Sequence, residues 1–287
     1  MADIPGLRYT CSQYGEHQLQ RVGVWQFEPS DKQPSGHWIV YIHGGAWRDP
    51  RIAHESFVPC IKAILSSADA SQLAIRGFAS IDYRLSAHPD LPQDPDTPQR
   101  ELRCARHPDH IQDVRSAIRF LADQHHLSGD YVLVGHSAGA TLAYQLLMGE
   151  YAIDGAQLAQ VPMPAANIGI AGIYDLVGLN ERHDGYEGFI SAAFGPEQDT
   201  WHRTSPARFS GSYKESSDKP LCNLLAWSSE DSLVDEPEID SMAAKLKKDG
   251  FDVMLYKDLK GDHDVFWEEG SQLVRLVSLA LQQLQSA

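Results

Sequence analysis

Tyr131-Val-Leu-Val-Gly-His-Ser-Ala-Gly-Ala140 is the stretch that decides the fold of this chain. Its first four residues predict a buried strand, and the small residues that follow predict a helix beginning near Ala138. Between them, Gly135-His-Ser-Ala-Gly139 matches the G-x-S-x-G turn, in which a serine sits on a strained strand-to-helix bend with its hydroxyl exposed. The two glycines lack the Cβ atoms that would clash in so sharp a turn. Ser137 is therefore the candidate nucleophile.

Strands and helices alternate along the rest of the chain. Short apolar runs predict strands buried on both faces, over residues 22–27, 38–42, 78–82, 131–134, 168–173, 222–227 and 251–256. Apolar residues at helical spacing lie between the third and fourth of these strands, before the seventh, and over 265–284. This alternation predicts an α/β fold with a mostly parallel central sheet, helices on both faces, and a ligand site at the carboxyl ends of the strands.

Length and composition predict a single soluble domain over residues 1–287. Apolar residues make up 43% of the chain, and the formal net charge is −15. No apolar run reaches the roughly 18 residues of a membrane span, and the N-terminus has no signal-peptide pattern. The four separated cysteines indicate reduced thiols, so we expect a cytoplasmic protein. An acidic surface repels phosphate backbones, which excludes nucleic acid as a partner. A homodimer is left open.

A proline-rich segment, residues 87–109, breaks the alternation of strands and helices. It carries five prolines and many charges, a composition too polar for regular structure. Long loops are often functional, but they are also tolerated as plain surface insertions. The sequence favours neither interpretation: the segment is an excursion near the site or an insertion on the surface.

A second motif supplies what a nucleophilic serine needs. Trp38-Ile-Val-Tyr-Ile-His-Gly-Gly-Ala-Trp47 is a strand that runs into the glycine pair Gly44 and Gly45. Fixed backbone N–H groups stabilise the oxyanion of acyl transfer without reorganisation, and the N–H of Ala138, after the nucleophile, points into the same space. We therefore predict an oxyanion hole built from these three amides. His43 is expected to orient the loop, and Trp47 to form a pocket wall.

The remaining catalytic groups are expected late in the chain, because this fold places its residues in the order Ser, acid, His. Asp231, in the polar loop after strand 222–227, is the first choice for the acid, and Asp235 is the second. His263 follows the last strand and precedes the last helix. It can accept the serine proton near neutral pH, while the acid holds its tautomer. No histidines show zinc-ligand spacing, so no metal or cofactor is expected.

Six segments together carry a resemblance to a known family. They are HGGAW (43–47), SIDYRLS (80–86), VGHSAGA (134–140), GIYDL (172–176), SSEDSLV (228–234) and GDHDVFW (261–267). The chain resembles the α/β-hydrolase superfamily over residues 38–274, and more narrowly the fungal kynurenine formamidases (arylformamidases), with their HGGxW loop and GHSxGA elbow. Hormone-sensitive-lipase-like esterases usually carry a third loop glycine, where this chain has Ala46. The 87–109 segment is longer than expected for the family.

The resemblance implies a Ser137–Asp231–His263 triad that hydrolyses N-formyl-L-kynurenine to L-kynurenine and formate, a step of tryptophan degradation toward NAD. A formyl group is the smallest acyl group, so the pocket must hold the aryl amino acid instead. Trp47 and Tyr174 are expected as aromatic walls, with 186–194 as a cover, and a plain core role is the alternative for each. Arg48 and Arg84 are the candidates for the substrate carboxylate, and Arg84 could equally be a structural ion-pair partner.

Two other functions stay open. A broad carboxylesterase acting on small esters would use the same catalytic groups, so the triad does not discriminate between the two substrates. A non-catalytic ligand-binding relative would be expected to lack a triad residue or the glycine loop, and this chain has both. The formamidase is therefore the primary prediction, with the carboxylesterase as the alternative.

Overall fold

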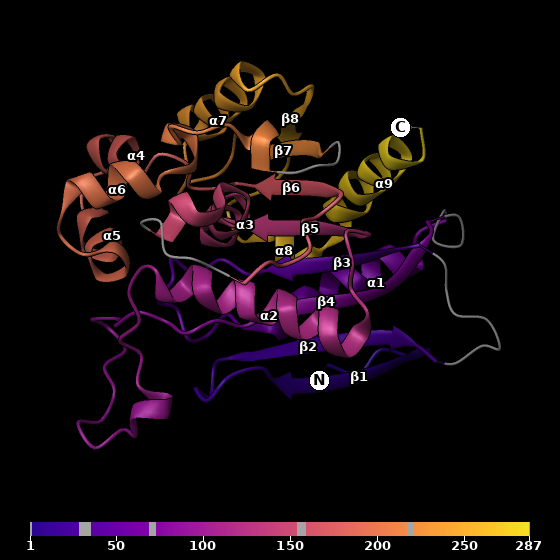
Figure 1. The fold of residues 1–287 in the computed structure, drawn as a ribbon, viewed down its shortest axis with the longest axis horizontal. Helices are drawn as coiled ribbons and strands as arrows, with labels where there is room; N and C mark the ends of the chain where they lie inside the picture. Colours follow the sequence, from indigo (N-terminus) through magenta and orange to yellow (C-terminus); the bar gives the residue numbers. More distant parts are fainter. Residues whose placement is uncertain (1, 29–35, 69–72, 154–158, 217–220, 287) are drawn as a thin grey trace.

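The computed structural model describes residues 2–28, 36–68, 73–153, 159–216 and 221–286. Within these ranges eight strands form one sheet in the order β1-β2-β4-β3-β5-β6-β7-β8 (Figure 1). The strands are β1 (Leu7–Gln13), β2 (Arg21–Phe27), β3 (His37–Ile42), β4 (Ile75–Ile81), β5 (Tyr131–His136), β6 (Ala166–Ile170), β7 (Cys222–Ser228) and β8 (Val253–Leu259).

The sheet is mostly parallel, as the alternation of elements predicts. Strands β4, β3, β5, β6, β7 and β8 run parallel to one another, whereas β2 pairs antiparallel with both β1 and β4. All seven predicted strands are present. The eighth, β1, was missed, because most of its side chains are exposed or half-buried and an edge strand of this kind has no continuous apolar run.

Helices cover both faces of the sheet (Figure 1). The helices α1 (Val58–Ser66), α8 (Val265–Glu269) and α9 (Ser271–Ser286) pack together on one face, and α2 (Asp109–His125), α3 (Ala138–Met148) and α7 (Glu236–Lys248) contribute to the core of the other. Three short helices, α4 (Leu176–Arg182), α5 (Glu187–Phe194) and α6 (Gln198–Thr204), lie beyond the arrowheads of β5 and β6. They therefore stand at the edge of the sheet where the ligand site is expected.

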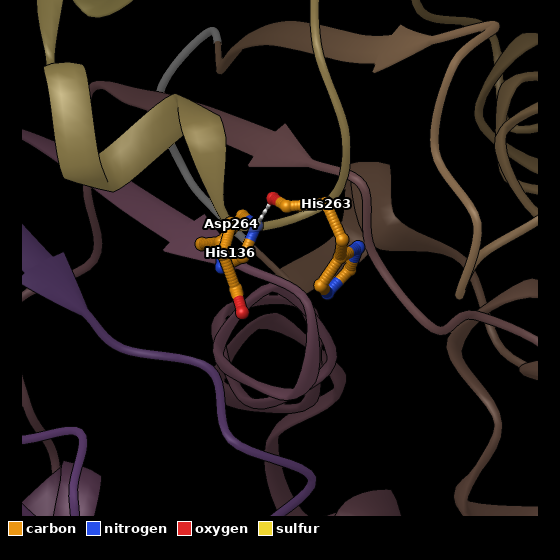
Figure 2. Close-up of side chains that lie close together, drawn as sticks. All are labelled: His136, His263 and Asp264. Atoms are coloured by element: carbon orange, nitrogen blue, oxygen red, sulfur yellow. Dashed lines mark hydrogen bonds between the residues drawn. The ribbon is translucent and has the colours of Figure 1, made fainter.

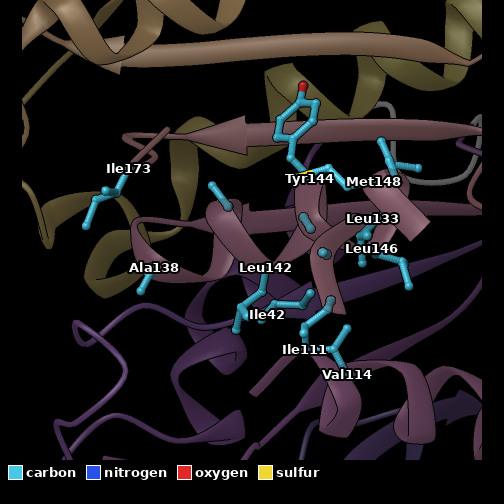
Figure 3. Close-up of a cluster of buried hydrophobic side chains, with 14 of the residues drawn as sticks. Ile42, Ile111, Val114, Leu133, Ala138, Leu142, Tyr144, Leu146, Met148 and Ile173 are labelled. Atoms are coloured by element: carbon cyan, nitrogen blue, oxygen red, sulfur yellow. The ribbon is translucent and has the colours of Figure 1, made fainter. Parts of the chain in front are cut away.

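Helix α3 is the centre of one core layer. Every one of its residues is buried, and Figure 3 shows Leu142 and Leu146 with Ile111 and Val114 of α2. Its small residues near the start allow close approach to the sheet: a Cβ on Gly139 would lie 2.1 Å from the carbonyl oxygen of Ile42. The position of the candidate nucleophile, directly before this helix, is thus fixed by packing.

The predicted helix over residues 265–284 is wrong in one respect, because two helices occupy this range. Gly270, with φ of +72°, separates α8 from α9. A Cβ at this position would lie 2.5 Å from the backbone nitrogen of Cys60 in α1. Close packing against α1 therefore requires both the break and the glycine, and apolar spacing alone does not reveal it.

The proline-rich segment leaves the carboxyl edge of the sheet after β4, extends away from it and returns to the start of α2 (Figure 1). It is held together by its own hydrogen bonds, since the Gln93 amide bonds Glu101 and the Arg103 backbone, and the Arg103 guanidinium bonds the Leu91 carbonyl oxygen. Its last residue, Asp109, already belongs to α2. In the described ranges no helix is long and apolar enough to cross a membrane.

Candidate active site

Ser137 lies on the strained turn that its motif predicts. Its φ and ψ of +54° and −123° are unfavourable for a residue with a Cβ. The turn leaves no room beside it: a Cβ on Gly135 would lie 2.5 Å from the Cα of Ala140. The Ser137 amide donates to the Ile170 carbonyl oxygen at 2.9 Å, which ties the turn to β6. The strain is maintained by the packing of α3 against the sheet.

His263 and Asp231 meet although 32 residues separate them. The Nδ1 atom of His263 lies 2.8 Å from Oδ2 of Asp231, and the carboxylate is 1% exposed. The other carboxylate oxygen accepts from the backbone N–H groups of Leu233 and Val234, both at 2.9 Å. Asp231 is therefore held in place from both sides and fixes which nitrogen of the imidazole faces it.

The loops that carry these two residues are joined by further hydrogen bonds. The Ser228 hydroxyl donates to the Gly261 carbonyl oxygen at 2.7 Å, and the Glu230 carboxylate accepts from the Gly261 N–H at 3.1 Å. Asp262 accepts from both the backbone and the hydroxyl of Ser232. These contacts fix the position of the His263 loop relative to the acid loop, so the imidazole does not rely on the carboxylate alone.

Asp235, the second choice for the acid, has a different partner. Its carboxylate forms a two-pronged ion pair with Arg182 of α4, with N–O distances of 2.6 and 3.1 Å. Arg182 also pairs with Glu238, a buried residue whose carboxylate accepts from the backbone N–H groups of Tyr174 and Asp175. Asp235 therefore belongs to the contact between α4 and α7 and does not face His263.

The glycine loop closes over the nucleophile turn. A Cβ on Gly44 would lie 3.0 Å from the Ser137 Cβ, so only glycine permits this approach without displacement. Gly45 has a φ of +93° and lines the same cavity as Ser137. The Ala138 amide is at the N-terminus of α3, where an N–H has no intrahelical acceptor. The three predicted oxyanion donors thus lie around the serine.

The buried carboxylate of Asp82 holds the glycine loop in place through His43. It lies 3.5 Å from Nε2 of His43, 2.8 Å from Nδ1 of His54 and 2.6 Å from Nε of Arg21. His43 stacks on Tyr83, whose hydroxyl donates to the carbonyl oxygens of His43 and Gly44. The predicted loop-orienting role of His43 is consistent with these contacts, and Asp82 and Tyr83 join it in holding the loop.

The pair of Asp82 and His54 predicts a specific pH dependence of stability. Burial opposes protonation of His54, but the hydrogen bond and charge of Asp82, together with Cys11 and Glu55, outweigh this and raise the pKa of His54 to about 9. Because this value exceeds the unfolded value, the stabilisation is complete below pH 6.5 and is lost as the pH rises through about 9. We expect the difference in unfolding free energy between wild type and His54→Gln to shrink over that interval. Urea unfolding at several pH values measures it, and parallel curves would contradict the prediction.

A cavity of about 340 Å³ opens beside the serine. Ser137, His263 and Gly45 line it, together with Tyr186 and Phe189 at the start of α5. Further lining residues are Arg48, Arg51, Ile173, Leu233 and His88. His88 belongs to the proline-rich segment, and His107 near its other end stacks on Phe194 of α5, so both ends of the segment lie near the site. The expected cover over 186–194 corresponds to α5, and two of its aromatic side chains form a wall.

Trp47 and Tyr174, expected as aromatic walls, are core residues in the structure. Their exposed fractions are 0% and 1%, and neither lines the cavity. The Trp47 ring packs beneath the site against Phe189 and Phe194, with ring centroids 6.2 and 4.9 Å apart. A tryptophan directly after the glycine loop therefore turns inward and supports the aromatic wall instead of forming it.

A group of three side chains beside the serine offers metal-ligand atoms. His136, His263 and Asp264 each place one such atom within 4.8 Å of the others (Figure 2). His136 is buried, and burial followed by the nearby His263 lowers its pKa well below 6.5, so the ring is neutral. Its Nε2 lies 3.0 Å from the His263 carbonyl oxygen. One nitrogen of each imidazole already has a partner, the His263 carbonyl oxygen for His136 and the Asp231 carboxylate for His263. That the site holds no metal stays a prediction.

Comparison with known proteins defines the family. The BD-FAE family profile matches residues 26–246. The chain belongs to the BD-FAE family. The matched range contains Ser137 and Asp231 and ends before His263, so the last part of this BD-FAE protein's site is outside it.

Curated relatives extend across most of the chain. A kynurenine formamidase-like hydrolase of Fusarium equiseti is 36% identical over 87% of this chain and 84% of its own length. Kynurenine formamidases of Aspergillus versicolor and Meyerozyma guilliermondii are 35% and 31% identical, covering 81% and 80% of this chain and 84% and 77% of theirs. The sequence resemblance to this group is therefore confirmed, and the protein is a hydrolase.

Solved structures confirm the fold. Carboxyl esterase 2 of Tuber melanosporum superposes with a TM-score of 0.66 at 15% identity, over 98% of this chain and 87% of that one. A hormone-sensitive-lipase homologue from a metagenome library gives 0.65 at 18% identity, over 97% and 88%. At such identities the likeness establishes the α/β-hydrolase fold and carries no substrate information.

Some residues of the BD-FAE site were not found from the sequence. His136 precedes the nucleophile, and this adjacency was the only signal that it contacts the His263 loop. Asp82 was quoted within SIDYRLS, but nothing in the sequence connects it with His43 and His54. Arg84, a candidate for the substrate carboxylate, is bound by Asp113 at 2.8 Å and Asp109 at 3.3 Å and does not line the cavity.

Proposed function

We propose that this protein hydrolyses the formamide of N-formyl-L-kynurenine to L-kynurenine and formate. The observation that supports this substrate is a set of three relatives, one named a kynurenine formamidase-like hydrolase at 36% identity and two named kynurenine formamidase at 35% and 31%, each covered over most of its length. The geometry supports the reaction class, because Ser137, His263 and Gly45 line one small cavity, and His263 is hydrogen-bonded to the buried carboxylate of Asp231. A cytoplasmic location stays a prediction.

The proposed reaction begins with attack of the Ser137 Oγ on the formyl carbon. His263 takes the hydroxyl proton, and Asp231 stabilises the imidazolium that forms. The amides of Gly44, Gly45 and Ala138 stabilise the oxyanion of the tetrahedral intermediate. His263 then gives the proton to the aryl nitrogen, the C–N bond breaks, and L-kynurenine leaves. Water, deprotonated by His263, attacks the formyl-serine ester and releases formate and the free serine.

The size of the cavity favours a one-ring substrate. A volume of about 340 Å³ lies at the small end of the range for ligand pockets. Tyr186 and Phe189 present rings to it, and Ile173 and Leu233 add apolar surface. An aryl amine leaving group packs against such walls, whereas the formyl group itself needs almost no space on the acyl side.

The alternative, a carboxylesterase acting on small esters, is tested by substrate preference. We expect a higher kcat/KM for N-formyl-L-kynurenine than for p-nitrophenyl acetate, although the ester is intrinsically the more reactive compound. Steady-state rates on both substrates, with the purified protein at one pH, measure the ratio. If the formamide is hydrolysed no better than the ester, the formamidase proposal is wrong and the esterase is the better description.

A further inference from the structure

Arg48 follows the glycine loop and is held at the mouth of the cavity by an unusual backbone turn. Ala46 and Trp47 both have positive φ values, 48° and 58°, and the Arg48 amide donates to the Gly45 carbonyl oxygen at 2.9 Å. The turn buries the Trp47 ring in the core and leaves Arg48 half-buried, lining the cavity. The guanidinium is thus coupled to the loop that supplies the oxyanion donors.

The guanidinium of Arg48 differs from the other arginines considered for the site. Arg51 also lines the cavity, but Asp49 binds it through two nitrogens. Arg84 is bound by Asp113. Within the described ranges Arg48 has no ion pair and no side-chain hydrogen bond, and its guanidinium carbon lies 5.7 Å from the centre of the Phe189 ring. A cation held this way has its hydrogen-bond donors available to a ligand.

An unpaired, half-buried cation is costly unless a ligand compensates it. Burial lowers the pKa of Arg48, although the charges of Asp90 and Asp49 act in the opposite direction. The guanidinium is planar, carries five N–H donors and matches a carboxylate in two-pronged geometry. Phe189 holds the guanidinium from one side through the ring face. The guanidinium N–H groups suit a carboxylate, and the neighbouring rings of Tyr186 and Phe189 suit an aromatic group. Together they indicate a ligand that carries a carboxylate and an aromatic ring.

We propose that Arg48 binds the carboxylate of the substrate's amino-acid side chain, and so makes the enzyme selective for anionic aryl formamides. This inference rests on the proposed function. The aryl ring lies against Tyr186 and Phe189, the formyl carbon lies at Ser137, and the amino-acid end reaches Arg48. A neutral formanilide has the same scissile bond but gains nothing from the guanidinium.

The test compares two variants on two substrates. Arg48→Met removes the charge but keeps an unbranched side chain, and Arg275→Met removes an exposed charge on α9 that Asp258 pairs with and that does not line the cavity. The substrates are N-formyl-L-kynurenine and formanilide, which lacks the amino-acid end. We expect Arg48→Met to lower kcat/KM for N-formyl-L-kynurenine by about 10- to 100-fold, mostly through KM, the size typical of a charge-assisted pair. The Arg275→Met loss should be under about 3-fold.

Two readouts separate carboxylate binding from a structural role of Arg48. A structural role would lower kcat/KM for both substrates by the same factor. Equal losses on formanilide and N-formyl-L-kynurenine therefore overturn the proposal, and so does no loss on either substrate. Inhibition of formanilide hydrolysis by L-kynurenine gives a binding measurement, and its inhibition constant should rise about 10-fold or more in Arg48→Met. Arg48→Lys, which keeps the charge without the planar fork, should fall between wild type and Arg48→Met.

Failure of this inference is distinguishable from failure of the proposed function. The proposed function is tested in the wild-type protein, with Arg48 intact, by the ratio of formamide to ester hydrolysis. The role of Arg48 is tested by the change of preference between an anionic and a neutral formamide. Suppose that the wild type prefers the formamide to the ester, and that Arg48→Met keeps the wild-type ratio of N-formyl-L-kynurenine to formanilide hydrolysis. The inference about Arg48 is then rejected, and the proposed function stands.

Discussion

Replacement of Ser137 by alanine should abolish hydrolysis, with a loss in kcat of about 10⁴- to 10⁶-fold, because no other group near His263 supplies a nucleophile in the proposed reaction. The fold should survive. Alanine keeps the Cβ and therefore the same backbone strain at φ of +54°, and no hydrogen bond of the Ser137 hydroxyl to another described residue is lost. Rates on N-formyl-L-kynurenine and thermal unfolding of both proteins measure the two effects.

Ser80 provides the matched control for Ser137. It is a fully buried serine on β4, and its hydroxyl has no hydrogen-bond partner in the described part of the chain. Ser80→Ala should change kcat/KM by less than about 3-fold. A serine-directed phosphonate should label wild type and Ser80→Ala, with the adduct on Ser137, and leave Ser137→Ala unlabelled. Retained turnover in Ser137→Ala would reject the nucleophile assignment.

Asp231→Asn should lower kcat by about 10⁴-fold, as expected when the acid of a serine triad is lost. The amide oxygen of asparagine can still accept from the N–H groups of Leu233 and Val234, so the turn is preserved. Its NH₂ group then faces Nδ1 of His263, at the 2.8 Å contact that the carboxylate made. That nitrogen must now accept, which places the proton on Nε2 and prevents the ring from taking the serine proton.

Asp235→Asn is the matched control, because Asp235 was the second candidate for the acid. It disrupts the ion pair with Arg182, a partly exposed contact between α4 and α7. We expect a stability loss of about 0.5–1 kcal/mol in urea unfolding and a change in kcat below about 3-fold. A larger catalytic loss in Asp235→Asn than in Asp231→Asn would transfer the acid role to Asp235.

The two acids show where sequence reasoning reached its limit. Both follow strand β7, and chain order alone ranks them without separating them. The separation comes from Arg182, which lies 53 residues before Asp235 and binds it. Arg48 and Arg84 were both candidates for the substrate carboxylate from sequence, with an ion-pair role left open for Arg84. Asp113, which follows the 87–109 segment in sequence, binds Arg84. Arg48 has no such partner among the described residues and contacts the Phe189 ring.

The prediction that Trp47 and Tyr174 form the walls of the pocket was wrong for a related reason. Trp47 and Tyr174 lie near catalytic motifs in sequence, but nearness does not reveal the side of the backbone from which a side chain projects. Two positive φ values before Arg48 turn Trp47 into the core. The wall is made by Tyr186 and Phe189, within the segment that the sequence predicted as a cover.

The sequence by itself determined the α/β-hydrolase fold, the nucleophile turn at Ser137 and the order of the groups that follow it. These features depend on local rules: apolar runs, glycines in a tight turn, and motifs a few residues long. Only the tertiary structure decided which acid faces His263, which arginine is unpaired and which rings reach the cavity. Those answers depend on partners that are tens of residues away along the chain, and such partners meet only when the sheet and its helices pack together.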